Sequence, residues 1–255
     1  MFPWESGFTG VEVCPTYAAT GLKEVHISGD IAIAVWQYHR LTNGTEIEWL
    51  QDVAWPILNG TASFWVSRTS ASLSPAGSAV SWLAGRPRRG DDAVENADAV
   101  ILSTPQHAPS ETRTGTPNGR SGTLHIDGVI PPDEYHLGDD SVYTNAVARL
   151  NLRFAIKAAS LLGHDSEPQV ATWQDTEPRI AMLFNETSLV HPEFAGYKGD
   201  TIKQADVILL GYPLGLGTES FGNVTAESRL ADLNYYDPRT SSGGPAMTWG
   251  MVATA

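Results

Sequence analysis

A mainly α-helical fold is predicted for this chain of 255 residues. Four segments carry apolar residues at helical spacing, and several of them have residues that start or end helices. Strand evidence is thin, because residues 125–130 and 180–184 are the only candidates. No apolar run approaches the roughly 20 residues that a membrane-spanning helix needs.

Two of the predicted helices lie in the N-terminal part of the chain. Asp30 is placed to cap a helix over residues 31–41, where apolar residues fall near one face. Thr45 is placed to cap a longer helix from residue 46 toward residue 66, which has its own apolar stripe. Pro56 lies inside this second pattern, and because proline has no N–H we expect it to kink or divide the helix.

The third predicted helix is the longest. Ser141 can cap residues 142–162, apolar residues follow the 3.6-residue period along that stretch, and Gly163 is placed to stop the helix. A shorter apolar segment over residues 205–212 is expected to be helical and to end at Pro213.

Residues 72–122 differ from both flanks in composition. They are rich in Ser, Pro, Gly and Arg and have no sustained periodicity. Structureless loops longer than about 15 residues are uncommon inside compact domains. We therefore expect a disordered surface insertion, with translated non-coding sequence in a gene model as the alternative.

The charge balance excludes some classes of partner. The chain has 29 acidic against 16 basic residues, for a net charge of -13. Nucleic acids and anionic membranes need clustered Lys and Arg, so we expect neither as a partner. A neutral ligand such as a sugar is compatible with this acidity.

Cysteine content and glycosylation motifs bear on the compartment. Cys14 is the single cysteine, so an internal disulfide is impossible. Four Asn-x-Ser/Thr motifs favour a secreted or vacuolar glycoprotein, and they begin at Asn43, Asn59, Asn185 and Asn223. The N-terminus lacks the basic and apolar regions of a signal peptide. Either the protein stays inside the cell or Met1 is not its natural start.

The most informative stretch runs from Pro132 to His136, just before the longest predicted helix. Asp133 and Glu134 place adjacent carboxyl groups beside an aromatic ring and an imidazole. Partial burial against rings raises the pKa of a carboxyl group and suits it to donate a proton to a leaving oxygen. On chemistry alone, the same residues also fit an ordinary acidic loop before a helix.

A series of ordered motifs resembles glycoside hydrolase family 65, which contains acid trehalases, the glucosidase acting on glucosylgalactosyl-hydroxylysine, and disaccharide phosphorylases. The ordered set is far more specific than any one of its short matches. The matching motifs are Phe2-Pro-Trp-Glu-Ser-Gly, Glu24-Val-His-Ile-Ser-Gly-Asp30, Ala54-Trp-Pro56, Phe64-Trp-Val-Ser-Arg68, Gly128-Val-Ile-Pro-Pro-Asp-Glu-Tyr-His136, Ser141-Val-Tyr-Thr-Asn145, His191-Pro-Glu-Phe-Ala-Gly-Tyr197, Lys203-Gln-Ala-Asp206 and Gly244-Pro-Ala-Met-Thr-Trp249.

The resemblance implies a fold and a mechanism. The family's catalytic domain is an (α/α)6 barrel of the six-hairpin glycosidase type, so residues 1–255 are expected to be part of one. Glu134 matches the general acid that protonates the glycosidic oxygen, and Lys203 and Gln204 match a pair that contacts the sugar. Family members invert the anomeric centre, which in hydrolases needs a second carboxylate about 6.5–9.5 Å away. No cofactor is expected.

The same resemblance predicts that this chain is an internal fragment. The family's general base is a glutamate well beyond the match at residues 244–249, and its Trp-Asp sugar-binding pair would lie before Met1. Twelve helices and their loops also need well over 255 residues. As written, the chain is therefore expected to be inactive.

Several further residues are weaker candidates for the site. Trp4 and Glu5 are predicted to border a sugar pocket, although Trp4 fits the core equally well. Tyr135 and His136 either line the sugar subsite or pack, while Asp133 is expected to shape the loop. A metal site is not expected, because His26, His164 and His191 lack metal-ligand spacing with one another.

Together these observations predict an inverting hydrolase that removes a terminal α-linked glucose from a small molecule or glycan. We place α,α-trehalose first among the substrates. The alternatives are a glucosidase acting on glucosylgalactosyl-hydroxylysine, a disaccharide phosphorylase, and a truncated polypeptide without activity. The sequence gives no indication of the oligomeric state.

Overall fold

The computed structural model describes residues 1–15, 17–71, 122–217 and 221–254. The insertion predicted at residues 72–122 therefore lies outside the described residues, apart from Gly122. The described helical elements are α1 (Thr20–Lys23), α2 (Ile27–Leu41), α3 (Ile47–Trp49), the π-helix Leu50–Ala54, α4 (Trp55–Arg68), α5 (Val142–Leu162), α6 (Pro168–Thr176), α7 (Ala226–Tyr236) and α8 (Met247–Thr254), with single 3-10 turns at Glu177–Arg179, Val207–Leu210 and Asp237–Arg239.

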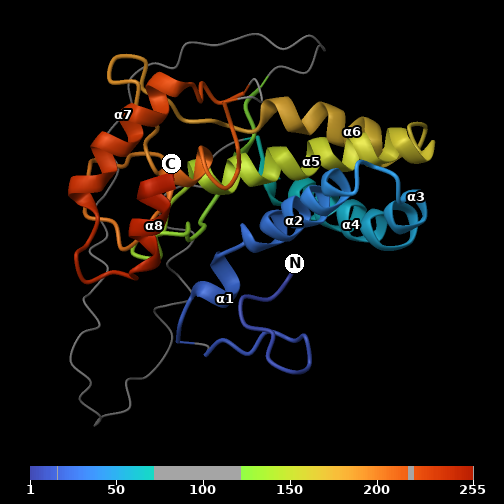
Figure 1. The fold of residues 1–255 in the computed structure, drawn as a ribbon, viewed down its shortest axis with the longest axis horizontal. Helices are drawn as coiled ribbons and strands as arrows, with labels where there is room; N and C mark the ends of the chain where they lie inside the picture. Colours follow the sequence, from blue (N-terminus) through green and yellow to red (C-terminus); the bar gives the residue numbers. More distant parts are fainter. Residues whose placement is uncertain (16, 72–121, 218–220, 255) are drawn as a thin grey trace.

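The structure confirms the mainly helical prediction. Helices α2, α4, α5 and α6 lie side by side, with α5 in contact with the other three, whereas α7 and α8 lie on the opposite side of the molecule (Figure 1). Two short strands, β1 (Thr69–Ser70) and β2 (His125–Ile126), pair antiparallel and bring the end of α4 to the loop before α5.

Helix α5 is the centre of the fold, and its boundaries are as predicted. The Ser141 hydroxyl accepts a hydrogen bond from the Thr144 N–H at 3.2 Å, and Gly163 ends the helix with φ at 75°. Every residue from Val142 to Leu152 is buried. The buried indole of Trp65 in α4 donates to Asn151 at 2.9 Å, which ties α4 to the middle of α5.

The predicted start of the first helix is wrong. Helix α2 begins at Ile27, so Asp30 lies within the first turn instead of capping it. Its carboxylate is used elsewhere, because it accepts hydrogen bonds from the Tyr143 hydroxyl and the His26 imidazole, both at 2.9 Å. A partner far away in the sequence has replaced the local cap.

The second predicted helix also begins without the cap that the sequence indicates. Thr45 does not cap it, since its hydroxyl donates to the Thr42 carbonyl at 2.7 Å. The stretch is divided near Pro56, as expected: α3 is followed by the π-turn Leu50–Ala54, and Pro56 lies in the first turn of α4. The Trp55 N–H donates to the carbonyl of Leu50, five residues earlier, and this wider turn accommodates the missing N–H of the proline.

The shorter predictions are corrected as well. Only Val207–Leu210 is helical within residues 205–212, as a single 3-10 turn. Residues 180–184 are not a strand, because Ile180 alone forms an isolated bridge, to Leu124. The sequence reasoning missed α6, α7 and α8; α7 begins with a reciprocal cap between Thr225 and Ser228.

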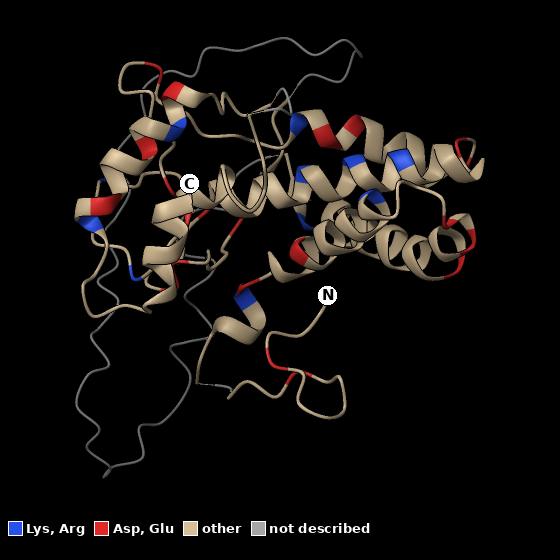
Figure 2. Ribbon diagram, viewed as in Figure 1, with Lys and Arg blue, Asp and Glu red and all other residues tan. Residues whose placement is uncertain are grey.

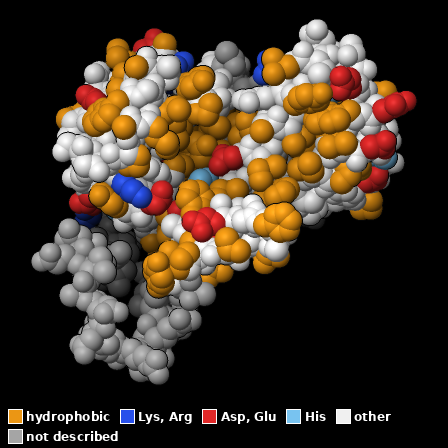
Figure 3. All heavy atoms as spheres, turned by 60° about the horizontal axis from the view of Figure 1, so that its bottom comes forward, with side chains coloured by type: hydrophobic (Ala, Val, Ile, Leu, Met, Phe, Trp, Pro, Cys, Tyr) orange, Lys and Arg blue, Asp and Glu red, His pale blue; other side chains and the backbone are white. Residues whose placement is uncertain are grey.

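The basic side chains of the described residues are not confined to one helix. Figure 2 shows Lys and Arg spread over several separate helices. None of the helices in the described ranges is both long and apolar enough to cross a membrane. The face that Figure 3 brings forward instead gathers hydrophobic side chains, with an acidic and a histidine side chain visible among them near its middle.

Candidate active site

Glu134 lies at the tip of a closed loop between β2 and α5. Reciprocal backbone hydrogen bonds of 2.9 and 3.0 Å between Val129 and Gly138 close the base of this loop. Gly138 is required there, since an added Cβ would lie 2.5 Å from the Phe194 ring. Glu134 has a φ of 63°, which is uncommon for a residue with a side chain and costs about 1–3 kcal/mol. The surrounding contacts must therefore hold it in place.

The structure brings Glu134, Lys203 and Gln204 together, as the resemblance implies. The Lys203 ammonium group donates to Glu134 Oε2 at 2.8 Å, and the Gln204 amide donates to Glu134 Oε1 at 3.1 Å. The Glu134 side chain is 21% exposed, so it is sheltered but reachable. Lys203 and Gln204 lie in a bend before the 3-10 turn Val207–Leu210 and are not part of a helix.

Asp133 shapes the loop, as expected from the sequence. Its carboxylate is fully buried and accepts hydrogen bonds from the backbone N–H groups of Tyr135 and Lys203. Its own N–H donates to Asp206 at 3.1 Å. The loop that carries Glu134 is thereby fastened to the segment that carries Lys203 and Gln204, and this explains how the strained backbone is maintained.

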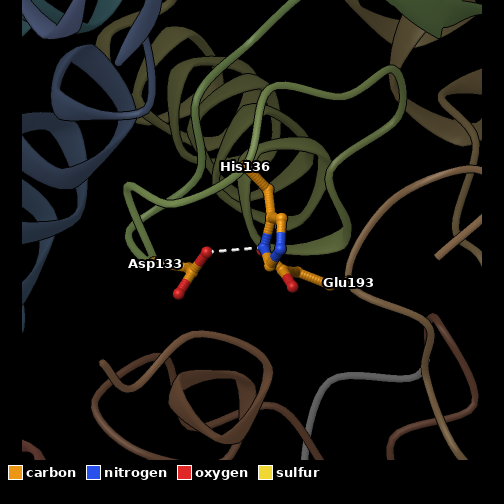
Figure 4. A group of neighbouring side chains, drawn as sticks. All are labelled: Asp133, His136 and Glu193. Carbon is orange, nitrogen blue, oxygen red and sulfur yellow. Dashed lines mark hydrogen bonds and ion pairs between the residues drawn. The ribbon is translucent and has the colours of Figure 1, made fainter. Parts of the chain in front are cut away.

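A buried ionic cluster lies next to this loop. The His136 imidazole is 2.7 Å from Asp133 and 3.3 Å from Glu193. Figure 4 shows the three side chains together, with the interaction between Asp133 and His136 as a dashed line. Burial by itself would lower the pKa of His136, but the bonds to Asp133 and Glu193 outweigh it and raise the pKa to about 10. Burial and neighbouring carboxylates also raise the pKa of Glu193 and of Asp206. The cluster therefore holds a protonated His136 in contact with Asp133 and Glu193, and burial favours the protonated forms of Glu193 and Asp206.

The geometry of Asp133, His136 and Glu193 is also compatible with metal binding, because their ligand atoms lie within 4.8 Å of one another. A metal ligand histidine must offer a neutral ring nitrogen. The Nδ1 of His136 contacts both carboxylates, at 2.7 Å from Asp133 and 3.3 Å from Glu193. We therefore assign the cluster as a hydrogen-bonded support for the loop and assign no metal to it.

The raised pKa of His136 predicts a pH-dependent stability. Its stabilising contribution is complete below about pH 6.5 and is lost as pH rises toward about 10. We expect the free energy of unfolding to fall by about 2–3 kcal/mol between pH 7 and 9.5. His136→Gln should flatten this decline, whereas His39→Gln should not, because the lowered pKa of His39 leaves it neutral throughout. Urea unfolding at both pH values provides the measurement, and equal slopes in the two variants would refute the role of His136.

Other predicted site residues are not brought to Glu134 by any described contact. The N–H groups of Trp4 and Glu5 donate instead to the Glu12 carboxylate, at 2.6 and 3.3 Å, and the Trp4 side chain is not in the core. Tyr135 is 49% exposed, with its backbone held by Asp133. Trp4, Glu5 and Tyr135 therefore lie at the border of the site around Glu134 at most. His136 packs beneath the loop and supports it.

The sequence reasoning missed two buried carboxyls, Glu193 and Asp206. Both lie within quoted motifs, but neither has local spacing that reveals which residues it will meet. A cavity of about 380 Å³ between the first two residues and α4 is lined by Pro56, Thr61 and mainly apolar neighbours. It contains none of the ionisable side chains described above, so we do not connect it with catalysis.

The sequence of this chain matches a family model. The family model of the glycosyl hydrolase family 65 central catalytic domain matches residues 1–77 and 112–201. The chain belongs to this family. A solved structure, a putative kojibiose phosphorylase from the human microbiome, aligns with a TM-score of 0.62 at 16% identity, over 96% of this chain and 34% of that one. The fold is accordingly part of an (α/α)6 barrel.

Curated relatives match the chain along almost its whole length. The protein-glucosylgalactosylhydroxylysine glucosidase of Dictyostelium discoideum is 36% identical over 100% of this chain and 28% of its own length. The enzyme of the same name from Danio rerio is 37% identical, over 99% and 30% respectively. A kojibiose hydrolase of Flavobacterium johnsoniae is 33% identical, over 97% and 28%. The chain thus spans less than a third of the length of these relatives.

Proposed function

We propose that this chain contributes the general acid of a glycosidase that removes a terminal α-linked glucose. The observation that carries the proposal is the position of Glu134, sheltered at a loop tip with Lys203 and Gln204 each bound to one of its oxygens. A carboxyl group held in this way can give its proton to the glycosidic oxygen of a bound sugar. The strained backbone of Glu134 is consistent with a residue held in place for function.

Lys203 and Gln204 have a second role in this proposal. The ammonium group can donate to sugar hydroxyls, and the amide can both donate and accept. When substrate enters, these groups can exchange their bonds to Glu134 for bonds to the glucose. Glu134 then faces the leaving oxygen while a water molecule, activated by a second carboxylate, attacks the other face of the ring. We assign no residue of this chain to that second carboxylate.

For the substrate we now favour glucosylgalactosyl-hydroxylysine over α,α-trehalose. Two relatives named as glucosidases for it are 36% and 37% identical to nearly all of this chain. A kojibiose hydrolase follows at 33%, so kojibiose is the second substrate to test. Relatives named as kojibiose phosphorylases are more distant, at 25% and 26%. This order favours hydrolysis over phosphorolysis.

Glucose release from the three glucosides tests the proposal. The full-length product of the gene that encodes these residues is assayed on a glucosylgalactosyl-hydroxylysine peptide, kojibiose and trehalose, each with and without inorganic phosphate. We expect the highest kcat/KM on the hydroxylysine glycoside and no dependence on phosphate. A strict requirement for phosphate would establish the phosphorylase alternative, and preference for trehalose would restore the first expectation from the sequence.

A further inference from the structure

The chain that leads into α8 runs alongside the segment that carries Lys203 and Gln204. The Ile202 N–H donates to the Arg239 carbonyl at 3.0 Å, and the Ser241 N–H donates to the Ile202 carbonyl at 2.8 Å. Ile202 is buried, so these two bonds are sheltered from water. They join the two segments immediately before the residues that bind Glu134.

Thr248, in the first turn of α8, is bonded to the residue that follows Gln204. Its Oγ1 accepts a hydrogen bond from the Ala205 N–H at 3.2 Å. This N–H belongs to the peptide group that joins Gln204 to Ala205, so the bond fixes the backbone from which the Gln204 side chain projects. Thr248 is 1% exposed, and a buried N–H that loses its acceptor destabilises the arrangement that contains it.

Gly244 makes the same approach possible for Lys203. A Cβ added to Gly244 would overlap the carbonyl group of Lys203. Glycine therefore lets the chain before α8 lie directly against this residue. The Lys203 N–H is held separately by the Asp133 carboxylate. Lys203 and Gln204 are thus fixed by contacts from two parts of the chain that are distant in the sequence.

We propose that Thr248 is a positioning residue for sugar binding, because its hydroxyl fixes the peptide group after Gln204 and thereby directs the Gln204 amide. That amide donates to Glu134 Oε1 at 3.1 Å. A turned backbone at Gln204 would carry the amide away from Glu134 and from the glucose that enters beside it. This inference rests on the proposed binding of glucose by Gln204. It also gives a role to the motif at residues 244–249, which the proposed mechanism does not otherwise use.

Steady-state kinetics of the full-length protein on the glucosylgalactosyl-hydroxylysine peptide tests this role. Thr248→Val keeps the shape of the side chain but offers no acceptor to the Ala205 N–H, so we expect KM to rise about tenfold while kcat changes less than about twofold. Destabilisation alone would lower the active fraction, and hence kcat, and leave KM unchanged. Thr248→Ser restores the hydroxyl and should return KM to within about twofold of the wild-type value. Thr254→Val, at the exposed end of the same helix, is the matched control and should leave both constants unchanged.

A double variant separates action through Gln204 from an independent effect. In a Gln204→Ala background the amide is gone, so Thr248→Val should raise KM by less than about twofold further. A further rise of about tenfold in that background would overturn the inference, as would an unchanged KM in folded Thr248→Val. If Thr248→Val does not fold, Thr248→Ala is compared with Thr248→Ser, because both lack the γ-methyl group and only alanine lacks the hydroxyl. The same difference in KM is then expected between these two variants.

Crystal structures of the wild-type protein and Thr248→Val test the inference without activity. The hydrogen bond between the Gln204 amide and Glu134 is expected to be broken in the variant. If the two groups stay at about 3.1 Å, Thr248 does not direct the amide and the inference is refuted. If the bond is broken but no glucoside is cleaved by the wild type, the proposed function fails while the positioning of Gln204 by Thr248 stands.

Discussion

Replacing Glu134 with Gln is expected to lower kcat for glucose release by about 10³-fold. The amide has nearly the same size and can still accept a hydrogen bond from Lys203, so the loop should remain in place. It cannot donate a proton to the leaving oxygen, and the barrier to bond cleavage should rise accordingly. Steady-state kinetics on the glucosylgalactosyl-hydroxylysine peptide, with KM nearly unchanged, is the measurement.

The control for this experiment is Glu48→Gln, which removes an exposed carboxylate from α3 and should leave kcat unchanged. Circular dichroism spectra of both variants establish that the fold is retained. If Glu134→Gln keeps more than about a tenth of the wild-type kcat, Glu134 is not the general acid. The site would then have to be sought in another part of the protein.

Asp133→Asn is expected to have the second largest effect, a loss of about 3 kcal/mol in the free energy of unfolding. Asp133 is fully buried and is the nearer counter-ion of His136, at 2.7 Å. The amide leaves the half-buried imidazolium of His136 without this partner. In the wild type, the Asp133 carboxylate accepts hydrogen bonds from the N–H groups of Tyr135 and Lys203. The NH2 group of asparagine would face one of these two N–H donors, and that hydrogen bond would be lost. Because the loop loses its fastening, kcat should fall as well.

Equilibrium unfolding in urea measures the stability change, with Asp52→Asn as the matched control. Asp52 is exposed in the π-turn, and removing its charge should change the free energy of unfolding by less than about 0.5 kcal/mol. Equal stabilities of the two variants would contradict the supporting role of Asp133. A stability loss without any change in kcat would separate the cluster from the position of Glu134.

The sequence predicted best those parts of the fold that depend on local signals. The long apolar period, Ser141 as cap and Gly163 as stop define α5 almost to the residue. Asp30 offered an equally good capping signal, but Tyr143 and His26 use its carboxylate in the folded protein. A capping residue is reliable only when no distant partner competes for its side chain.

In the candidate site, too, some residues could be predicted from sequence motifs and others depend on partners that are distant in the sequence. Motifs shared with family 65 pointed to Glu134, Lys203 and Gln204, and the structure brings these three residues together. The supporting carboxyls Glu193 and Asp206 could not be predicted from spacing. Their partners come from segments that meet only after folding, and their protonation depends on burial that no local pattern reveals.

The most direct test of Glu134 as general acid compares two leaving groups. Fluoride departs from α-glucosyl fluoride without needing a proton, whereas the sugar alcohol of a natural glucoside needs one. We predict that Glu134→Gln loses about 10³-fold in kcat on the natural glucoside but less than about tenfold on the fluoride. An equal loss on both substrates would contradict the assignment, because it would show that Glu134 acts at a step other than proton donation.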